Sequence, residues 1–235
     1  MPRAGEDMAR GEVIAPVLQT LVEGRGAANI TFCGLTFAYA TWNEPSRRGI
    51  IFEQANLIVL AHPGVGQPMR TGYVHGNVHF AGARTVFRGH RFEHLGGDAL
   101  VLDGGAKDNR IQGNAFTDIS GAGIRLGDYA NPQAPPAERE TNNLIADNVL
   151  HDLPREYRGG NAIFTGYTER TTVEHYTVYN APYTAVSAGY GFGMPNYQSG
   201  LHFIGNHLYD FGQVLPDGAV STSTADRVAR MKQER

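Results

Sequence analysis

The strongest constraint on the fold is an internal repeat. The stretch TVFRGHRFEHLGGDALVLDG (85–104) returns 24 residues later as NRIQGNAFTDISGAGIRLGD (109–128), with two glycines and a phenylalanine in matching places. One apolar position recurs further along the chain, at Phe92, Phe116, Leu150, Val178 and Leu208. Periods of about 20 to 50 residues are typical of stacked units that cannot bury their apolar faces alone. The chain is therefore expected to stack copies of one unit.

The residues within each repeat predict strands. Ile124 and Leu126 alternate with Arg125, a period of two rather than the 3.6 of a helix. Leucine-rich repeats have a similar length, but the asparagines here do not fall in the leucine frame of those proteins. The pattern therefore predicts an all-β, right-handed parallel β-helix of about six coils, each stacked about 4.8 Å from the next. A ten-residue segment, YANPQAPPAE (129–138), lengthens one repeat and is expected to form a loop.

Polar residues recur in two columns. The first holds Asn114, Asn148 and Asn206, and we expect an internal ladder of amide hydrogen bonds that Tyr176 interrupts. The second follows the recurring apolar position, at His94, Asp118, Asp152, Asn180 and Asp210. Asp and Asn at turns usually satisfy their own backbone, so a structural role is expected for the acids. His94 departs from the pattern, and with Asp118 one coil away it could act as an acid or base.

Composition excludes several classes of protein. The net charge of −3 and the charged fraction of 18% give no basic footprint for nucleic acid. No apolar run is long enough for a membrane span, and the N-terminal residues have no apolar core, so we expect no signal peptide in this chain. Cys33 has no partner for an internal disulfide, and no zinc spacing or calcium loop is present, so no metal or cofactor is expected. We expect an extension (1–11), a β-helix domain (12–220) and a polar tail (221–235) that is either a helical cap or disordered.

Several segments carry a family resemblance. FEHLGGDAL, GNAFTDISGAGIRLGD, YNAPYTAVSAGYGFG and LPDGAV together resemble the right-handed parallel β-helix proteins of the pectate-lyase-like superfamily, and more narrowly the carbohydrate-active group around glycoside hydrolase family 141. The resemblance runs from Glu12 to about Val220. It implies a polysaccharide or oligosaccharide ligand and an extracellular or periplasmic location. Members of that group are usually longer than this chain, and the oligomeric state stays open.

Alignment of the coils places candidate sugar contacts in one outward column. Arg125 and Phe164 share that column, and three residues further along stand Asp128, Tyr167 and Tyr190. An acid followed by two tyrosines on successive coils suits a sugar-binding groove, because aromatic rings offer flat apolar faces and a carboxylate binds hydroxyls or transfers protons. The alternative is a set of strand-end residues that stand in solvent.

Hydrolysis of a glycosidic bond needs two carboxylates, about 5 to 9.5 Å apart. Asp217 replaces a turn glycine of the other coils, and it is paired here with Asp128 as the catalytic couple. Glu156 and Arg158 lie in HDLPREYRGG (151–160), which is expected to form a protruding loop with substrate-binding groups. Trp42, the single tryptophan, is either a sugar platform or a core anchor.

Three functions follow from these residues. The first is a glycoside hydrolase that uses Asp217 and Asp128. The second is a polysaccharide lyase, in which Arg125 or Arg158 would serve as base or clamp because the chain has only Lys107 and Lys232 as lysines. The third is a catalytically incomplete β-helix that binds glycans or has a structural role. Elimination leaves an unsaturated uronate that absorbs ultraviolet light, which separates the first two functions.

Overall fold

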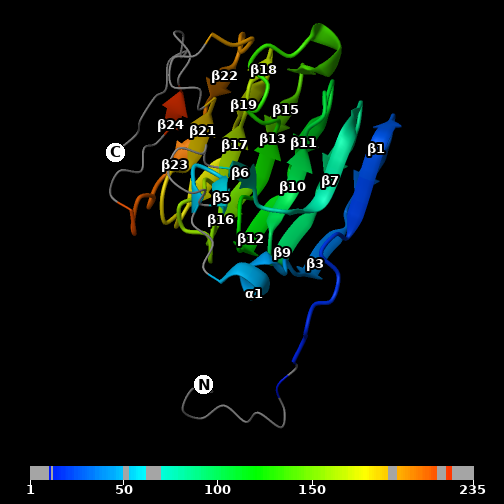
Figure 1. The fold of residues 1–235 in the computed structure, drawn as a ribbon. Coiled ribbons are helices and arrows are strands. Elements are labelled where there is room, and N and C mark those ends of the chain that lie inside the picture. Colours follow the sequence, from blue (N-terminus) through cyan, green and yellow to red (C-terminus); the bar gives the residue numbers. More distant parts are fainter. Residues whose placement is uncertain are drawn as a thin grey trace.

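The computed structural model describes residue 11 and residues 13–49, 53–61, 70–189, 195–215 and 221–223. Three parallel sheets run along a solenoid (Figure 1), as the repeat predicts. Sheet A contains β1 (Val22–Ala28), β7 (Gly76–Ala83), β10 (Asp98–Leu102), β13 (Ile124–Leu126), β17 (Ile163–Thr165), β21 (Val186–Ala188) and β24 (Ser221–Ser223). Sheet B contains β2 (Thr31–Cys33), β8 (Val86–Arg88), β11 (Arg110–Gln112), β15 (Leu144–Ala146), β19 (Thr172–Glu174) and β22 (His202–Ile204). Sheet C contains β3 (Thr36–Ala40), β9 (Arg91–Leu95), β12 (Ala115–Ile119), β16 (Val149–His151), β20 (Thr177–Tyr179) and β23 (His207–Leu208).

The core lies between the three sheets and stacks like residues on like. In sheet C, Phe92 pairs with Phe116, which pairs with Leu150. All three side chains are fully buried, and the two phenylalanine rings stack with centroids 4.5 Å apart and planes 4° from parallel. The parallel register places equivalent residues one coil apart, so a repeated sequence becomes a repeated contact.

The expected amide ladder is confirmed at the corner between sheets B and C. The side-chain oxygen of Asn148 accepts hydrogen bonds from the backbone and side-chain nitrogens of Asn114 at 3.0 and 2.9 Å. The backbone nitrogen of His90 donates in the same way to Asn114 at 2.9 Å. Tyr176 interrupts the ladder, and its buried hydroxyl has no hydrogen-bond partner among the described residues. The ladder therefore satisfies buried backbone groups that no strand pairing reaches.

The backbone conformation explains which residue types occupy the second polar column. Each of its five members has a positive φ, at His94 (55°), Asp118 (51°), Asp152 (54°), Asn180 (53°) and Asp210 (48°), and so does Tyr39 (59°) at the equivalent place in β3. We call this column the αL ladder. Asn, Asp and His are the side chains most often found in the left-handed region, where other residues are costly. A kink that recurs in every coil of sheet C therefore selects these residue types.

An insert between β3 and β7, which the repeat does not predict, carries α1 (Glu44–Arg48) and a small antiparallel sheet. The sheet is formed by β4 (Glu53–Gln54), β5 (Leu57–Ala61) and β6 (Arg70–Tyr73), drawn in cyan in Figure 1. It packs on the outer face of sheet A, where the ring of Tyr73 lies over the guanidinium of Arg125 at 4.7 Å. This insert turns part of an outer sheet face into a second buried layer.

The remaining irregular parts are short. The segment 129–138 forms the expected loop and contains the 3-10 turn η1 (Pro136–Glu138), after which β14 (Glu140–Thr141) pairs with β18 (Thr168–Glu169). β24 pairs with β21, so sheet A continues three residues past the boundary expected at residue 220. Among the described helices, none is long and apolar enough to cross a membrane.

Candidate functional site

Two adjoining hollows follow the αL ladder along the solenoid, and we call them together the groove. The larger hollow has a volume of about 690 Å³, and its lining includes Trp42, His94, Asp118, Glu156 and Tyr157. The smaller hollow has a volume of about 310 Å³ and is lined by Asp152, Pro154, Arg155, Arg158, Asn180, Pro182, Gln213 and Val214. Arg155 lines both hollows. Cavities of this size are ordinary for small-ligand sites.

The larger hollow contains a histidine–carboxylate pair. Nδ1 of His94 lies 2.6 Å from Oδ2 of Asp118, and the two side chains are each 46% exposed. On its other side His94 stacks against the ring of Tyr39, with centroids 5.2 Å apart. Nε of Arg155 lies 3.5 Å from Oδ1 of Asp118. Asp118 therefore has a basic group near each of its two oxygens while the pair stays open to solvent.

A loop at residues 153–160 forms one wall of the groove. Its backbone is joined to the end of β12, because Arg155 N donates to Ile119 O at 2.8 Å and Tyr157 N donates to Ser120 O at 3.0 Å. These bonds hold the exposed side chain of Glu156 in the lining of the larger hollow. The loop that the sequence marked as protruding is thus fixed to the solenoid at its base.

An aromatic pair supports the floor of the larger hollow. Trp42 and Tyr157 meet edge to face with centroids 5.2 Å apart, and their exposed fractions are 8% and 6%. Both pack against Ile58 and Val74 of the insert. Trp42 therefore anchors a small apolar cluster, one of the two roles that the sequence left open, and it also lines the hollow, while its use as a sugar platform stays a prediction.

Two buried carboxyl groups lie behind this floor. Oδ1 of Asp98 accepts a hydrogen bond from Ala122 N at 2.8 Å, and Nε of Arg125 lies 3.1 Å from Oδ2. Burial raises the pKa of Asp98 to about 6, although the charge of Arg125 opposes the shift. Burial, and then the charge of Asp98, raises the pKa of Glu53 well above its ordinary value. Neither carboxyl oxygen of Glu53 has a hydrogen-bond partner among the described residues.

The sequence reasoning missed both of these acids. Asp98 is the one charged residue of β10, whose five residues are all buried, and that contrast was a usable signal. Glu53 lies in β4 of the insert, outside the repeat, where no column marks it.

The predicted outward column of sheet A has the expected register but is not an open groove. Val101, Arg125, Phe164 and Ser187 pair coil by coil. Arg125 and Phe164, however, are only 6% and 0% exposed, and Tyr167 is 2% exposed. Tyr73 of the insert packs against both Arg125 and Phe164, and the ring of Tyr197 packs against that of Tyr167 with centroids 6.0 Å apart. The expectation of exposed sugar contacts there is therefore wrong for these three residues.

Asp128 lies apart from the groove, at the end of β13. Its Oδ1 accepts a hydrogen bond from Ala130 N at 2.8 Å, a turn that satisfies local backbone. Nearby, the hydroxyl of Tyr197 donates to Glu140 Oε2 at 2.7 Å. Burial and, more weakly, the charge of Asp128 raise the pKa of Glu140. Asp217 and Tyr190, the other predicted members of this region, lie outside the described residues.

No group of three or more His, Cys, Asp or Glu side chains suited to a metal occurs in the described part of the chain. The groove and the αL ladder instead offer carboxylates, one histidine, amides and arginines. Such a set can bind hydroxyl groups and can transfer protons.

Comparison with known proteins defines the class. Residues 73–220 match the model of the right-handed β-helix region, and the chain belongs to that family. A solved structure described as a glycoside hydrolase is similar to this one, with a TM-score of 0.76 and 25% sequence identity. The match covers 90% of this chain and 42% of that protein, so this chain spans less than half the length of that glycoside hydrolase. No curated protein matches the sequence.

Proposed function

We propose that the chain is a carbohydrate-active β-helix protein, a glycoside hydrolase that binds a polysaccharide or oligosaccharide in the groove. The observation that carries this proposal is the shared lining of the larger hollow, which joins the His94–Asp118 pair to a second acid, Glu156. The likeness to a glycoside hydrolase supports the same class. An extracellular or periplasmic location is part of the proposal and rests on that likeness.

The proposed chemistry uses the two carboxyl groups of the larger hollow. Glu156 donates a proton to the glycosidic oxygen as the bond from that oxygen to the anomeric carbon breaks. Asp118, flanked by His94 and Arg155, is the ionised partner and either attacks the anomeric carbon or takes a proton from the attacking water. His94 acts by positioning Asp118, in the way that a hydrogen-bonded neighbour fixes a catalytic group.

A second hydrolase site is kept as the alternative. Asp128 and Glu140 form an electrostatically linked pair at the end of β13, and Asp128 was the sequence candidate. The buried state of Glu140 and its bonds to Tyr197 and to Gly105 N favour a structural role for that acid. The groove is therefore the better-supported location.

The test is a screen of the purified protein against neutral and acidic polysaccharides, in which reducing ends and ultraviolet absorbance are read together. Asp118→Asn and Glu156→Gln should each lower the release of reducing ends by at least about a hundredfold. Asp210→Asn is the matched control, because it belongs to the same αL ladder but lines neither hollow.

Other outcomes select other functions. Absorbance that rises with the reducing ends indicates a lyase, and binding without turnover indicates a glycan-binding β-helix. Activity that survives in Asp118→Asn and is lost in Asp128→Asn contradicts the groove and moves the site to the end of β13.

A further inference from the structure

The smaller hollow has an excess of positive charge. Arg155 and Arg158 both come from the loop at residues 153–160, and both are exposed. The side chain of Arg155 is 57% exposed, and its only ion pair among the described residues is the 3.5 Å approach to Asp118 in the larger hollow. Arg158 forms no ion pair with any carboxylate in the described part of the chain. Two guanidinium groups thus face the hollow without a dedicated anionic partner inside it.

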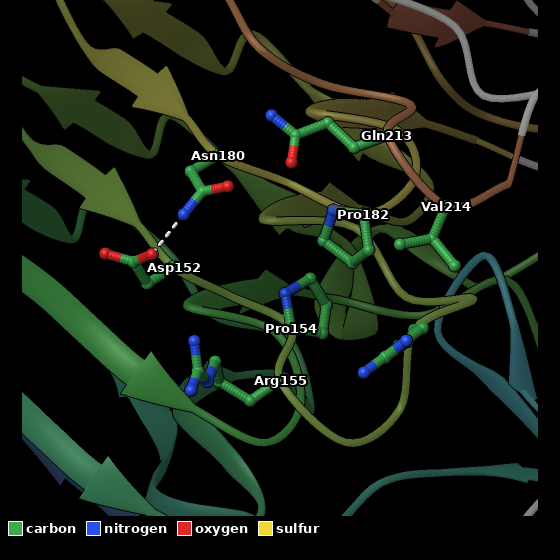
Figure 2. A pocket seen from close by; sticks show the side chains of 8 residues that line it. Asp152, Pro154, Arg155, Asn180, Pro182, Gln213 and Val214 are labelled. Atoms are coloured by element: carbon green, nitrogen blue, oxygen red, sulfur yellow. Dashed lines mark hydrogen bonds between the residues drawn. The ribbon is translucent and has the colours of Figure 1, made fainter.

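The one carboxylate that lines this hollow is already occupied. Nδ1 of His151 lies 2.7 Å from Oδ2 of Asp152, and Nδ2 of Asn180 donates to Oδ1 of Asp152 (Figure 2). Both oxygens of Asp152 are therefore engaged, one by the adjacent His151 and the other by Asn180 of the αL ladder. Asp152 therefore contacts His151 and Asn180 and forms no ion pair with Arg158 among the described residues.

The other lining groups suit a ligand that has a flat polar end. Pro154, Pro182 and Val214 supply apolar wall, and Asn180 and Gln213 supply amides (Figure 2). The fork of an arginine matches the two oxygens of a carboxylate, or two oxygens of a sulfate, better than it matches a hydroxyl. The two guanidinium groups outnumber the single carboxylate of the lining, Asp152, so the balance of charge in the hollow favours an anion.

The walls of the smaller hollow are already built. Val214 N and Leu215 N donate to Pro182 O at 3.0 and 3.1 Å, and Gly212 N donates to Tyr183 O at 2.9 Å. The opposite wall is held by the bond from Arg155 N to Ile119 O. Preformed walls reduce the ordering cost that a ligand must overcome on binding.

We propose that the smaller hollow is a subsite for an anionic substituent, a carboxylate or a sulfate, on the glycan whose reacting part lies in the larger hollow. This inference rests on the proposed function, and it narrows the substrate class to acidic saccharides. The hollows follow the αL ladder, in which Asp118 and Asp152 stand one coil apart, about 4.8 Å. A sugar that carries the anion can therefore lie next to the sugar that reacts.

The experiment measures binding of matched oligosaccharides by calorimetry at low salt. The pairs share one backbone and differ only in a uronate, its methyl ester or an added sulfate. The unmodified protein should bind the anionic member about tenfold more tightly than the neutral member, and the uronate and sulfate arms identify which anion is preferred. Arg158→Gln should lower the ratio of the two affinities from about tenfold to about one, whatever its effect on the affinity for the neutral member. Arg110→Gln, an exposed arginine of sheet B, is the matched control.

The outcomes of this experiment are separable from those of the proposed function. Equal affinities for neutral and anionic members, or a preference that survives in Arg158→Gln, overturn the anionic subsite. Neutral binding that is lost in Asp118→Asn would in that case still support the groove. Absence of binding by every member overturns both proposals.

Discussion

The buried pair of Glu53 and Asp98 makes the stability of the protein depend on pH in an unusual direction. The pKa of Asp98 rises from 3.8 to about 6 on folding, because burial outweighs the charge of Arg125. A raised carboxyl pKa gives stability that is complete below pH 3.8 and is lost as the pH rises to about 6. At about 1.4 kcal/mol for each pH unit, a shift of a little over two units amounts to about 3 kcal/mol. Glu53 adds a loss of the same sign above pH 4.5.

Asp98→Asn isolates this effect. The amide retains an oxygen that can accept the hydrogen bond from Ala122 N but carries no titratable charge. The difference in unfolding free energy between variant and parent should therefore shift by about 3 kcal/mol in favour of the variant between pH 3.8 and pH 7. The reason is that burial of the ionised carboxylate of Asp98 costs more than the charge of Arg125 offsets, and the amide has no ionised form.

Urea unfolding at a series of pH values measures this difference. Trp42 is the single tryptophan, and it is buried beside Tyr157 and the insert, so its fluorescence reports loss of that packing. A slope of about 2 to 3 kcal/mol per molar urea converts the expected change into about 1 M in the unfolding midpoint.

The quantity to compare is the difference in unfolding free energy between Asp98→Asn and the parent at each pH, because other groups titrate in both proteins. Burial lowers the pKa values of His75 and His90, and these histidines oppose the trend below pH 6.5. Glu138→Gln, at an exposed glutamate, is the control and should leave the curve unchanged. If the curves of Asp98→Asn and the parent run parallel from pH 3.8 to pH 7, the reasoning about the buried pair is refuted.

Three further predictions concern the scaffold, each measured by the urea midpoint at pH 7. Asn114→Ala leaves His90 N without its acceptor and removes the side-chain donor to Phe87 O, and it should cost about 2 to 4 kcal/mol, so an unchanged midpoint would contradict the ladder's role. Phe116→Ala removes a fully buried stacked ring and should cost about 3 to 5 kcal/mol, so a loss below 1 kcal/mol argues against the stack. Asp210→Gly should be neutral or slightly stabilising, whereas Asp210→Val should cost about 1 to 2 kcal/mol because φ is 48° there, and equal effects would contradict the backbone explanation.

The solenoid was predictable because its contacts repeat with its sequence. The alignment that placed Arg125 beside Phe164 is the register that the sheet adopts. The insert was missed because its strands pair antiparallel with one another and copy no other coil. Its one sequence signal was the spacing of Phe37 and Phe92. They occupy neighbouring strands of sheet C but lie 55 residues apart, whereas Phe92 and Phe116 on the next pair of strands lie 24 apart.

The candidate site was predicted in part. His94, Glu156 and Trp42 were selected for separate reasons, and the structure brings them together in the larger hollow. Sequence could not reveal this meeting, because it depends on how the loop at residues 153–160 folds back onto β12. Burial of Phe164 was equally hidden, since a repeat predicts which residues share a face but does not predict what covers that face.

The αL ladder has a consequence for how such a surface can acquire chemistry. A kinked backbone that recurs in each coil restricts its residues to a small set, and that set is rich in carboxylates and amides. Folding requirements alone thus supply a row of reactive and hydrogen-bonding side chains at the protein surface, spaced by one coil. A catalytic site in this position would therefore use side chains that the backbone conformation already requires. The loop at residues 153–160 packs beside this row of side chains, and the loop and the row together line the two hollows of the groove.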